Sequence, residues 1–252
     1  MSTVVSETSI KVTEKYDIKS FEVNANNELK PFVLLQHLED AAYVHAEKYG
    51  FGYSATYPNG YGWFVIKYHI KLNKLPRAWE KISITTWPCL SKGIQCRRDF
   101  EIYDENNAKI GKVASSWALI DLGAKRIVNP FKTLNFPELK EEYALSTDFA
   151  KFEPVQNACY EKLIDVRFDD LDLNKHVNNA NYIAWATEAM PYEFLSENSI
   201  SEIEIYYKKE AKYGMKILSQ TEIQPDSNIT LHTLKDSSTG EELALIRIHW
   251  HQ

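Results

Sequence analysis

The stretch 172–179, Asp-Leu-Asn-Lys-His-Val-Asn-Asn, decides the fold because it leads directly into a predicted buried helix. It places polar side chains at alternate positions, namely Asp172, Asn174, His176 and Asn178. Apolar residues then recur with the spacing of a helix that buries one face, and these are Tyr182, Ile183, Trp185, Ala186, Ala189 and Met190. Pro191 limits this pattern. We therefore expect a helix over 179–190, with Asn178 or Asn179 as its N-cap residue.

Strands are predicted on both sides of this helix. Segment 161–168 precedes it and is rich in β-branched and aromatic residues. Four more segments of this kind follow, at 201–207, 216–223, 229–235 and 242–250. The C-terminal half therefore reads as one strand, one helix and four strands.

The N-terminal half repeats this order. A strand is expected at 16–23. A helix is expected to begin at Pro31 and to end before Gly50, because proline is common in the first turn of a helix and glycine just after its end. Four strands are then predicted at 63–72, 81–87, 95–103 and 112–121. Turn-rich stretches stand at matching places in the two halves, 104–107 and 236–240. The repeated order indicates a duplicated topology.

A five-stranded antiparallel sheet can bury one long apolar helix only by curling around it. This arrangement is the hotdog fold, so we expect an α+β double hotdog of two tandem domains. The expected N-terminal domain is 1–129 and the C-terminal domain, which carries the motif, is 158–252. The linker between them, 130–157, is interrupted by prolines, and a short helix is predicted near 138–144.

Composition excludes several classes of function. The 252 residues are 44% hydrophobic and 25% charged, which is typical of a globular chain, and the net charge of -6 gives no support for nucleic-acid binding. Apolar runs are too short to cross a membrane, and the start of the chain lacks the pattern of a targeting segment, so a cytoplasmic location is expected. Cys89, Cys96 and Cys159 have no metal-ligand spacing, so free thiols are expected, with no metal and no cofactor.

The chain resembles the acyl-acyl-carrier-protein (acyl-ACP) thioesterase family of plants and bacteria, and it looks like a bacterial-type member. The resemblance spans about residues 16–250 and rests on five stretches: 172–179 with Tyr182 and Trp185, Tyr-Lys-Lys-Glu at 207–210, Arg-Arg-Asp-Phe-Glu-Ile at 97–102, Ser-Trp-Ala-Leu-Ile-Asp at 116–121, and Arg126 before Pro130. It implies hydrolysis of fatty acyl-ACP to free fatty acid and holo-ACP, with Asp172, Asn174, His176 and Glu210 as the catalytic set. Plant members have a Cys after the Glu; Ala211 stands there in this chain, which favours direct attack by water.

The residue types fit this chemistry. Thioester hydrolysis needs an activated water and a donor for the oxyanion, whereas the thiol, with a pKa of roughly 8.5, leaves almost unaided. Glu210 is the predicted general base, although Asp172 could share or replace that duty, or hold His176 in one tautomer. His176 would contact the thioester carbonyl or the water, and Asn174 would orient the acting carboxylate. Backbone N–H groups around Asn178 and Asn179 are the predicted oxyanion donors.

Partners and alternatives follow from the same resemblance. The carrier protein of this family is acidic, and candidate docking residues are the basic clusters Arg97–Arg98, Lys125–Arg126 and Lys208–Lys212. Unpaired sheet edges make a homodimer plausible by analogy. An acyl-CoA or aromatic-CoA thioesterase of the same fold, and a non-catalytic acyl-binding module, stay open as alternatives; a dehydratase fits the residues less well.

Overall fold

The computed structural model describes residues 10–91, 93–172, 175–225 and 227–251. The N-terminal half contains β1 (Val12–Asp17), α1 (Pro31–Lys48), α2 (Tyr53–Thr56), β2 (Tyr61–Leu72), β3 (Lys81–Cys89), β4 (Cys96–Asp104), β5 (Lys109–Asp121), β6 (Arg126–Val128) and α3 (Pro130–Thr133). The C-terminal half contains β7 (Tyr160–Asp165), α4 (Asn181–Thr187), α5 (Tyr192–Glu197), β8 (Ser199–Tyr207), β9 (Lys216–Ile223), β10 (Ile229–Asp236) and β11 (Glu242–His251). Short 3-10 turns lie at Ser20–Glu22, Tyr57–Asn59 and Phe168–Asp170.

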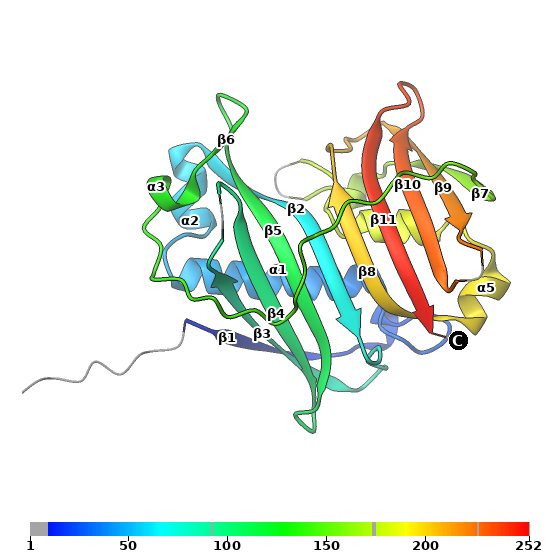
Figure 1. Cartoon of the computed structure of the whole chain (residues 1–252), viewed down its shortest axis with the longest axis horizontal. Helices are drawn as coiled ribbons and strands as arrows, with labels where there is room; N and C mark the ends of the chain where they lie inside the picture. Colours follow the sequence, from blue (N-terminus) through cyan, green and yellow to red (C-terminus); the bar gives the residue numbers. More distant parts are fainter. Residues whose placement is uncertain (1–9, 92, 173–174, 226, 252) are drawn as a thin grey trace, which may run out of the picture.

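All of these strands join one antiparallel sheet. Their order is β1-β3-β4-β5-β2-β8-β11-β10-β9-β7, and β6 pairs with β5 (Figure 1). Each half has the same neighbour order, β1-β3-β4-β5-β2 in the first and β7-β9-β10-β11-β8 in the second, and the halves meet where β2 pairs with β8 from Lys67↔Tyr206 to Lys71↔Glu202. The predicted duplication and the α+β double hotdog are therefore confirmed, whereas the domain boundaries stay a prediction.

Helix α1 lies against one face of the sheet in the N-terminal half, behind the strands in Figure 1. It starts at Pro31, and Gly50, just beyond its end, has φ +76°, a left-handed conformation that only glycine adopts without strain. Leu34, Leu35 and Leu38 are buried on the face toward the sheet. This burial is the main stabilising term for the helix, because removal of apolar surface from water is worth about 25 cal/mol per Å².

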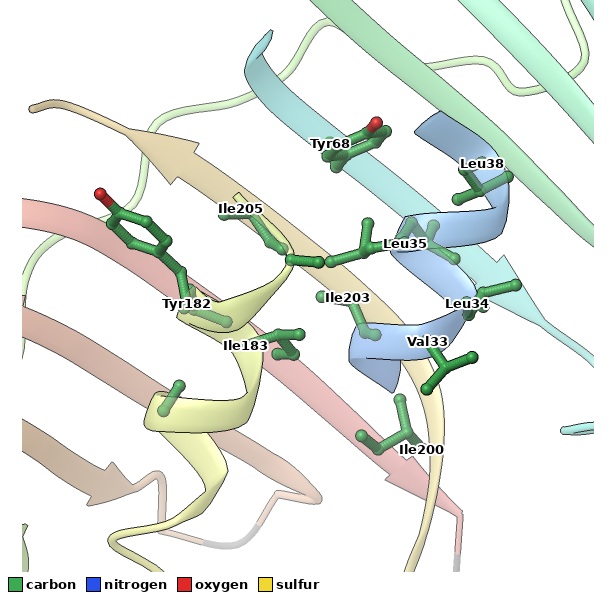
Figure 2. Close-up of a cluster of buried hydrophobic side chains, with 14 of the residues drawn as sticks. Val33, Leu34, Leu35, Leu38, Tyr68, Tyr182, Ile183, Ile200, Ile203 and Ile205 are labelled. Carbon is green, nitrogen blue, oxygen red and sulfur yellow. The ribbon is translucent and has the colours of Figure 1, made fainter. Parts of the chain in front are cut away.

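Helix α4 is shorter than predicted. It spans Asn181–Thr187 instead of 179–190, and a turn separates it from α5. The predicted cap is also wrong, because Asn178 Oδ1 accepts a hydrogen bond from the N–H of Ala180, two residues on, and so forms a turn ahead of the helix. In Figure 2, Ile183 of α4, Leu35 of α1 and Ile203 of β8 belong to the same buried cluster. The core is therefore continuous between the two halves.

Two other elements differ between the prediction and the structure. The first strand lies earlier than expected, at Val12–Asp17, and no helix forms at 138–144. That segment belongs instead to an extended connection that crosses the sheet on the side opposite α1 (Figure 1). It is fixed there by Arg97, which donates to the carbonyl of Leu145 (2.5 Å), and by the hydroxyl of Tyr206, which donates to the carbonyl of Phe149 (2.7 Å). Among the described residues, no helix has the length and apolar character needed to span a bilayer.

Candidate active site

The loop that carries the motif closes on itself. The N–H of Asp172 donates to the carbonyl of His176 (2.7 Å), and Asp172 Oδ1 accepts the backbone N–H of His176 (3.1 Å). Lys175 completes the turn with φ +64°. The Asp172 carboxylate thus binds the backbone of His176 rather than its ring, which differs from the predicted control of the tautomer. Asn174, a predicted catalytic residue, lies outside the described residues.

Hydrogen bonds tie this loop to the segment after β8. The N–H of Val177 donates to the carbonyl of Ala211 (3.3 Å), and the N–H of Ala211 donates to the hydroxyl of Tyr182 (2.7 Å). The hydroxyl of Tyr207 donates to the carbonyl of Asn179 (3.0 Å). Ala211 is fully buried. These bonds hold the segment that carries Glu210 against the motif loop.

His176 and Glu210 meet at the surface of the site. Nε2 of His176 lies 3.5 Å from Oε2 of Glu210, and the two side chains are 31% and 43% exposed. Nδ1 of His176 is buried and has no hydrogen-bond partner in the described part of the chain. Because both side chains are partly exposed, water can reach the Nε2 side of the ring and the carboxylate together.

The two predicted oxyanion donors, the backbone N–H groups of Asn178 and Asn179, differ in their hydrogen bonding. The N–H of Asn178 donates to the carbonyl of Asp170 (2.9 Å), so this group is already used. The N–H of Asn179 makes no hydrogen bond within residues 10–91, 93–172, 175–225 and 227–251. Of the pair, only Asn179 can offer a donor without breaking an existing bond.

Glu39 of α1, a residue that the sequence reasoning missed, also reaches the motif loop. Its Oε2 accepts from Nδ2 of Asn178 at 3.3 Å, and the residue is only 9% exposed. Burial, with a smaller contribution from the charge of Asp172, raises the pKa of Glu39 to about 7, although the bond from Asn178 lowers it. Its position one turn after Leu35, on the apolar face of the helix, was the available signal, because a glutamate is rarely buried unless its carboxyl group has a partner.

Two pockets lie side by side in the N-terminal half, and His176 lines one of them. The first, of about 630 Å³ including the open space at its mouth, is lined mainly by aromatic residues such as Tyr57, Tyr61 and Phe64 next to His176. The second, of about 470 Å³, is apolar and lies between α1 and the sheet, with Ala42, Ala46 and Trp117 in its wall. The pockets share Tyr43, Tyr53 and Trp63. The three shared residues thus separate a pocket that reaches His176 from an apolar pocket behind it.

The basic clusters differ in accessibility. Arg97 pairs with Asp99 (2.7 Å), which is fully buried, and Arg98 is only 6% exposed, so the prediction that this cluster could dock a partner is wrong. These two arginines lie on β4, where the strand is covered on one side by α1 and on the other by the connection. Lys125 and Arg126 are exposed, three and four residues after Leu122, which lines the first pocket.

Lys208 and Lys209 are also exposed, but each pairs with an acidic residue of the neighbouring chain segment, Glu242 and Glu241 respectively. Lys212 follows them and is exposed. Basic side chains therefore occur both on the hairpin near Leu122 and next to Glu210.

One group in the described part of the chain has the donor types of a metal site, namely Glu202, Glu204 and His249. Lys71 pairs with Glu202 (3.1 Å) and Arg247 pairs with Glu204. The carboxylates are thus already neutralised by cationic side chains, and the group reads as a network of ion pairs.

The chain is similar to proteins of known family. The sequence model described as "Acyl-ACP thioesterase N-terminal domain" matches residues 9–132, and "Acyl-ACP thioesterase C-terminal domain" matches residues 154–252. A chloroplastic acyl-acyl-carrier-protein hydrolase of Cuphea viscosissima is 25% identical over 229 residues, which are 84% of this chain and 55% of that relative, so the chain spans about half of its length.

Two solved structures share the fold. An acyl-ACP thioesterase from Bacteroides thetaiotaomicron superposes with a TM-score of 0.83 at 22% identity, over 96% of this chain and 98% of that chain. The 12:0-ACP thioesterase from Umbellularia californica gives a TM-score of 0.84 at 22% identity, over 97% and 98%.

Proposed function

Because the chain belongs to the acyl-ACP thioesterase family, we propose that it hydrolyses fatty acyl-ACP thioesters to free fatty acid and holo-ACP. The observation that carries the proposal is the approach of His176 Nε2 to Glu210 Oε2 at 3.5 Å, where His176 also lines a pocket with mainly aromatic walls. A carboxylate and an imidazole at this separation can both contact one water molecule, which is what attack on a thioester requires.

In the proposed step, Glu210 takes a proton from water while the water oxygen bonds to the thioester carbon. The carbonyl electrons move to oxygen, and the N–H of Asn179 is the proposed donor to that oxyanion. The tetrahedral intermediate then collapses, the C–S bond breaks, and the thiolate takes the proton back from Glu210. The thiol has a pKa of roughly 8.5, so its departure needs no strong acid.

His176 is proposed to orient the water toward the carbonyl carbon. Asp172 is proposed to act indirectly, because its carboxylate closes the turn through the backbone N–H of His176. Asn174 remains a proposed member of the catalytic set on the strength of the motif alone. Glu210 is thus the proposed general base, and Asp172 is the residue proposed to position His176.

The acyl chain is proposed to lie in the two pockets, with the thioester at His176 and the methyl end between α1 and the sheet. The apolar wall and the shared aromatic residues Tyr43, Tyr53 and Trp63 support this orientation. The acidic carrier protein is proposed to dock over the mouth, between the Lys125–Arg126 hairpin and Lys212.

We also propose a cytoplasmic location and a homodimer formed through a free sheet edge. In the sheet that the described residues form, β1 and β7 are the outer strands, and an outer strand can pair with a second chain. Light scattering of the purified protein tests the second point, and a monomeric mass would reject it.

Steady-state hydrolysis tests the function itself. Release of thiol from acyl-ACP at a rate well above that from acyl-CoA of the same chain length is the expected result. Release from acyl-CoA alone would instead indicate a CoA thioesterase, and acyl binding without release would indicate a binding module.

A further inference from the structure

A carboxyl group from the N-terminal half is buried against the motif loop of the C-terminal half. Glu39 lies on α1, is 9% exposed, and contacts Asn178 across 139 positions of the sequence. Only one of its two oxygens has a partner: Oε2 accepts from Asn178, whereas Oε1 is buried without a hydrogen-bond partner in the described part of the chain. An ionised carboxylate in this position would lack compensation for one oxygen, which is costly in a buried environment.

The side chain of Asn178 is held at both ends. Its Oδ1 accepts from the N–H of Ala180 (2.8 Å) and its Nδ2 donates to Glu39. Asn178 lies two residues after His176, and its own N–H is fixed by the carbonyl of Asp170. Fixing the Asn178 amide therefore restrains the backbone that carries His176 and the proposed oxyanion donor at Asn179.

Among the described residues, the groups whose charges act on Glu39 include no cation. Asp172 faces it from the loop, Tyr43 from the next turn of α1, Tyr68 from β2 and Tyr207 from β8. Burial keeps the pKa of Tyr68 and Tyr207 well above the ordinary value, so both phenols are neutral. Asp172 is thus the charged neighbour, and its charge has the same sign as an ionised Glu39.

We propose that Glu39 is a positioning residue of the hydrolytic site, which holds Asn178 from the other half of the molecule and does so as a neutral carboxylic acid. This inference rests on the proposed function. The neutral acid can accept from Asn178 on one oxygen and carry its proton on the other. Ionisation would place a second negative charge beside Asp172 and disturb the loop that presents His176.

The charge state agrees with the environment. Burial first, and then the charge of Asp172, raise the pKa of Glu39 to about 7. Because the folded-state pKa exceeds the ordinary value of 4.5, the folded protein keeps this proton over a pH range in which the unfolded chain has lost it. Stability therefore falls as the pH rises from about 4.5 to about 7, and the whole contribution is lost above that. Gln at this position cannot ionise, so it should mimic the acid form at every pH.

The test compares Glu39→Gln, Glu39→Ala and the wild type from about pH 5.5 to about pH 8.5. Asp40→Asn is the matched control, because Asp40 is the next residue of α1 but is exposed and accepts from the hydroxyl of Tyr16. Melting temperature and kcat on acyl-ACP are measured for each protein at each pH.

For melting, the advantage of Glu39→Gln over the wild type should grow by several degrees between about pH 5.5 and about pH 7 and stay nearly constant above that. For kcat, the ratio of wild type to Glu39→Gln should fall about tenfold between about pH 5.5 and about pH 8.5. Glu39→Ala should lower kcat about tenfold or more at every pH, because Asn178 loses its anchor. Asp40→Asn should follow the wild type throughout.

If the wild type hydrolyses acyl-ACP but its pH profiles of melting and kcat are identical to those of Glu39→Gln, the inference about Glu39 fails while the proposed function stands. Full kcat in Glu39→Ala would also overturn the inference, because the positioning role would be absent. If the wild type hydrolyses no thioester, the proposed function fails, and the positioning role fails with it.

Discussion

The hydroxyl of Tyr182 accepts a hydrogen bond of 2.7 Å from the backbone N–H of Ala211 and donates one of 3.3 Å to the carbonyl of Lys209. Tyr182 is 2% exposed and belongs to α4, whereas Lys209 and Ala211 are the neighbours of Glu210 in the sequence. One side chain of the helix therefore fixes the backbone on both sides of the proposed general base.

The first prediction follows from this pair of bonds. Tyr182→Phe leaves the buried N–H of Ala211 without an acceptor, so it should lower the free energy of unfolding by about 1–3 kcal/mol. Glu210 loses its fixed position, so kcat should fall about tenfold or more. Urea unfolding and thiol release measure the two effects, with Tyr192→Phe, which is 69% exposed, as the control. Wild-type kcat in Tyr182→Phe would show that Glu210 needs no such support.

A second prediction concerns the connection between the halves. Arg97 neutralises the fully buried Asp99, whose Oδ2 also accepts the N–H of Ala144 (2.8 Å), and Arg97 holds the carbonyl of Leu145. Arg97→Ala should therefore lower the free energy of unfolding by about 3–5 kcal/mol, because a buried carboxylate loses its partner. The exposed Arg77→Ala is the control. An unchanged stability with a raised KM on acyl-ACP would instead place Arg97 in the docking surface.

Chain-length preference supplies a third prediction. Ala46 is 8% exposed and lines the apolar pocket between α1 and the sheet. Ala46→Phe should fill the far part of that pocket and lower kcat/KM for the longest accepted acyl chain about tenfold or more, with little change for chains a few carbons shorter. Val44→Phe, on the exposed side of the same helix, is the control. An unaltered preference would mean that the acyl chain lies elsewhere.

Carrier docking gives a fourth prediction. Lys125 and Arg126 are exposed close to Leu122 at the mouth of the first pocket. The double variant Lys125→Glu, Arg126→Glu should raise KM on acyl-ACP about tenfold through charge repulsion and leave hydrolysis of acyl-CoA nearly unchanged. The control is the double variant Lys15→Glu, Lys19→Glu, which makes the same change of total charge at two exposed positions, in β1 and just after it. Equal effects of the two double variants would indicate a response to total charge.

Apolar spacing, strand-forming residues and turn signals in the sequence predicted most of the helices and strands. The strand predicted at 216–223 and the helix predicted between Pro31 and Gly50 have nearly the bounds of β9 and α1, because local backbone preference and burial agree there. The first strand and the 138–144 segment were misplaced, since their conformation depends on pairing with β3 and on the Arg97 contacts, which are distant in sequence.

The candidate site was only partly predictable. The motif loop and Glu210 were found because their residues are specific to the family, and the structure brings His176 and Glu210 together. Glu39 was missed because its role depends on a contact with Asn178 that only the assembled core creates. Arg97 and Arg98 looked like a surface cluster because charge alone does not reveal burial.

The most direct test of the central claim is thiol release from matched acyl-ACP and acyl-CoA series by the wild type, Glu210→Gln and Glu241→Gln. Glu210 and Glu241 have side chains of similar exposure, 43% and 47%, but Glu241 pairs with Lys209, whereas Glu210 approaches His176. The account predicts faster release from acyl-ACP, a loss of kcat on the order of 10² to 10⁴ in Glu210→Gln, and near wild-type kcat in Glu241→Gln. Near wild-type turnover in Glu210→Gln would contradict the assignment of the base, and no release by the wild type from either series would contradict the enzyme itself.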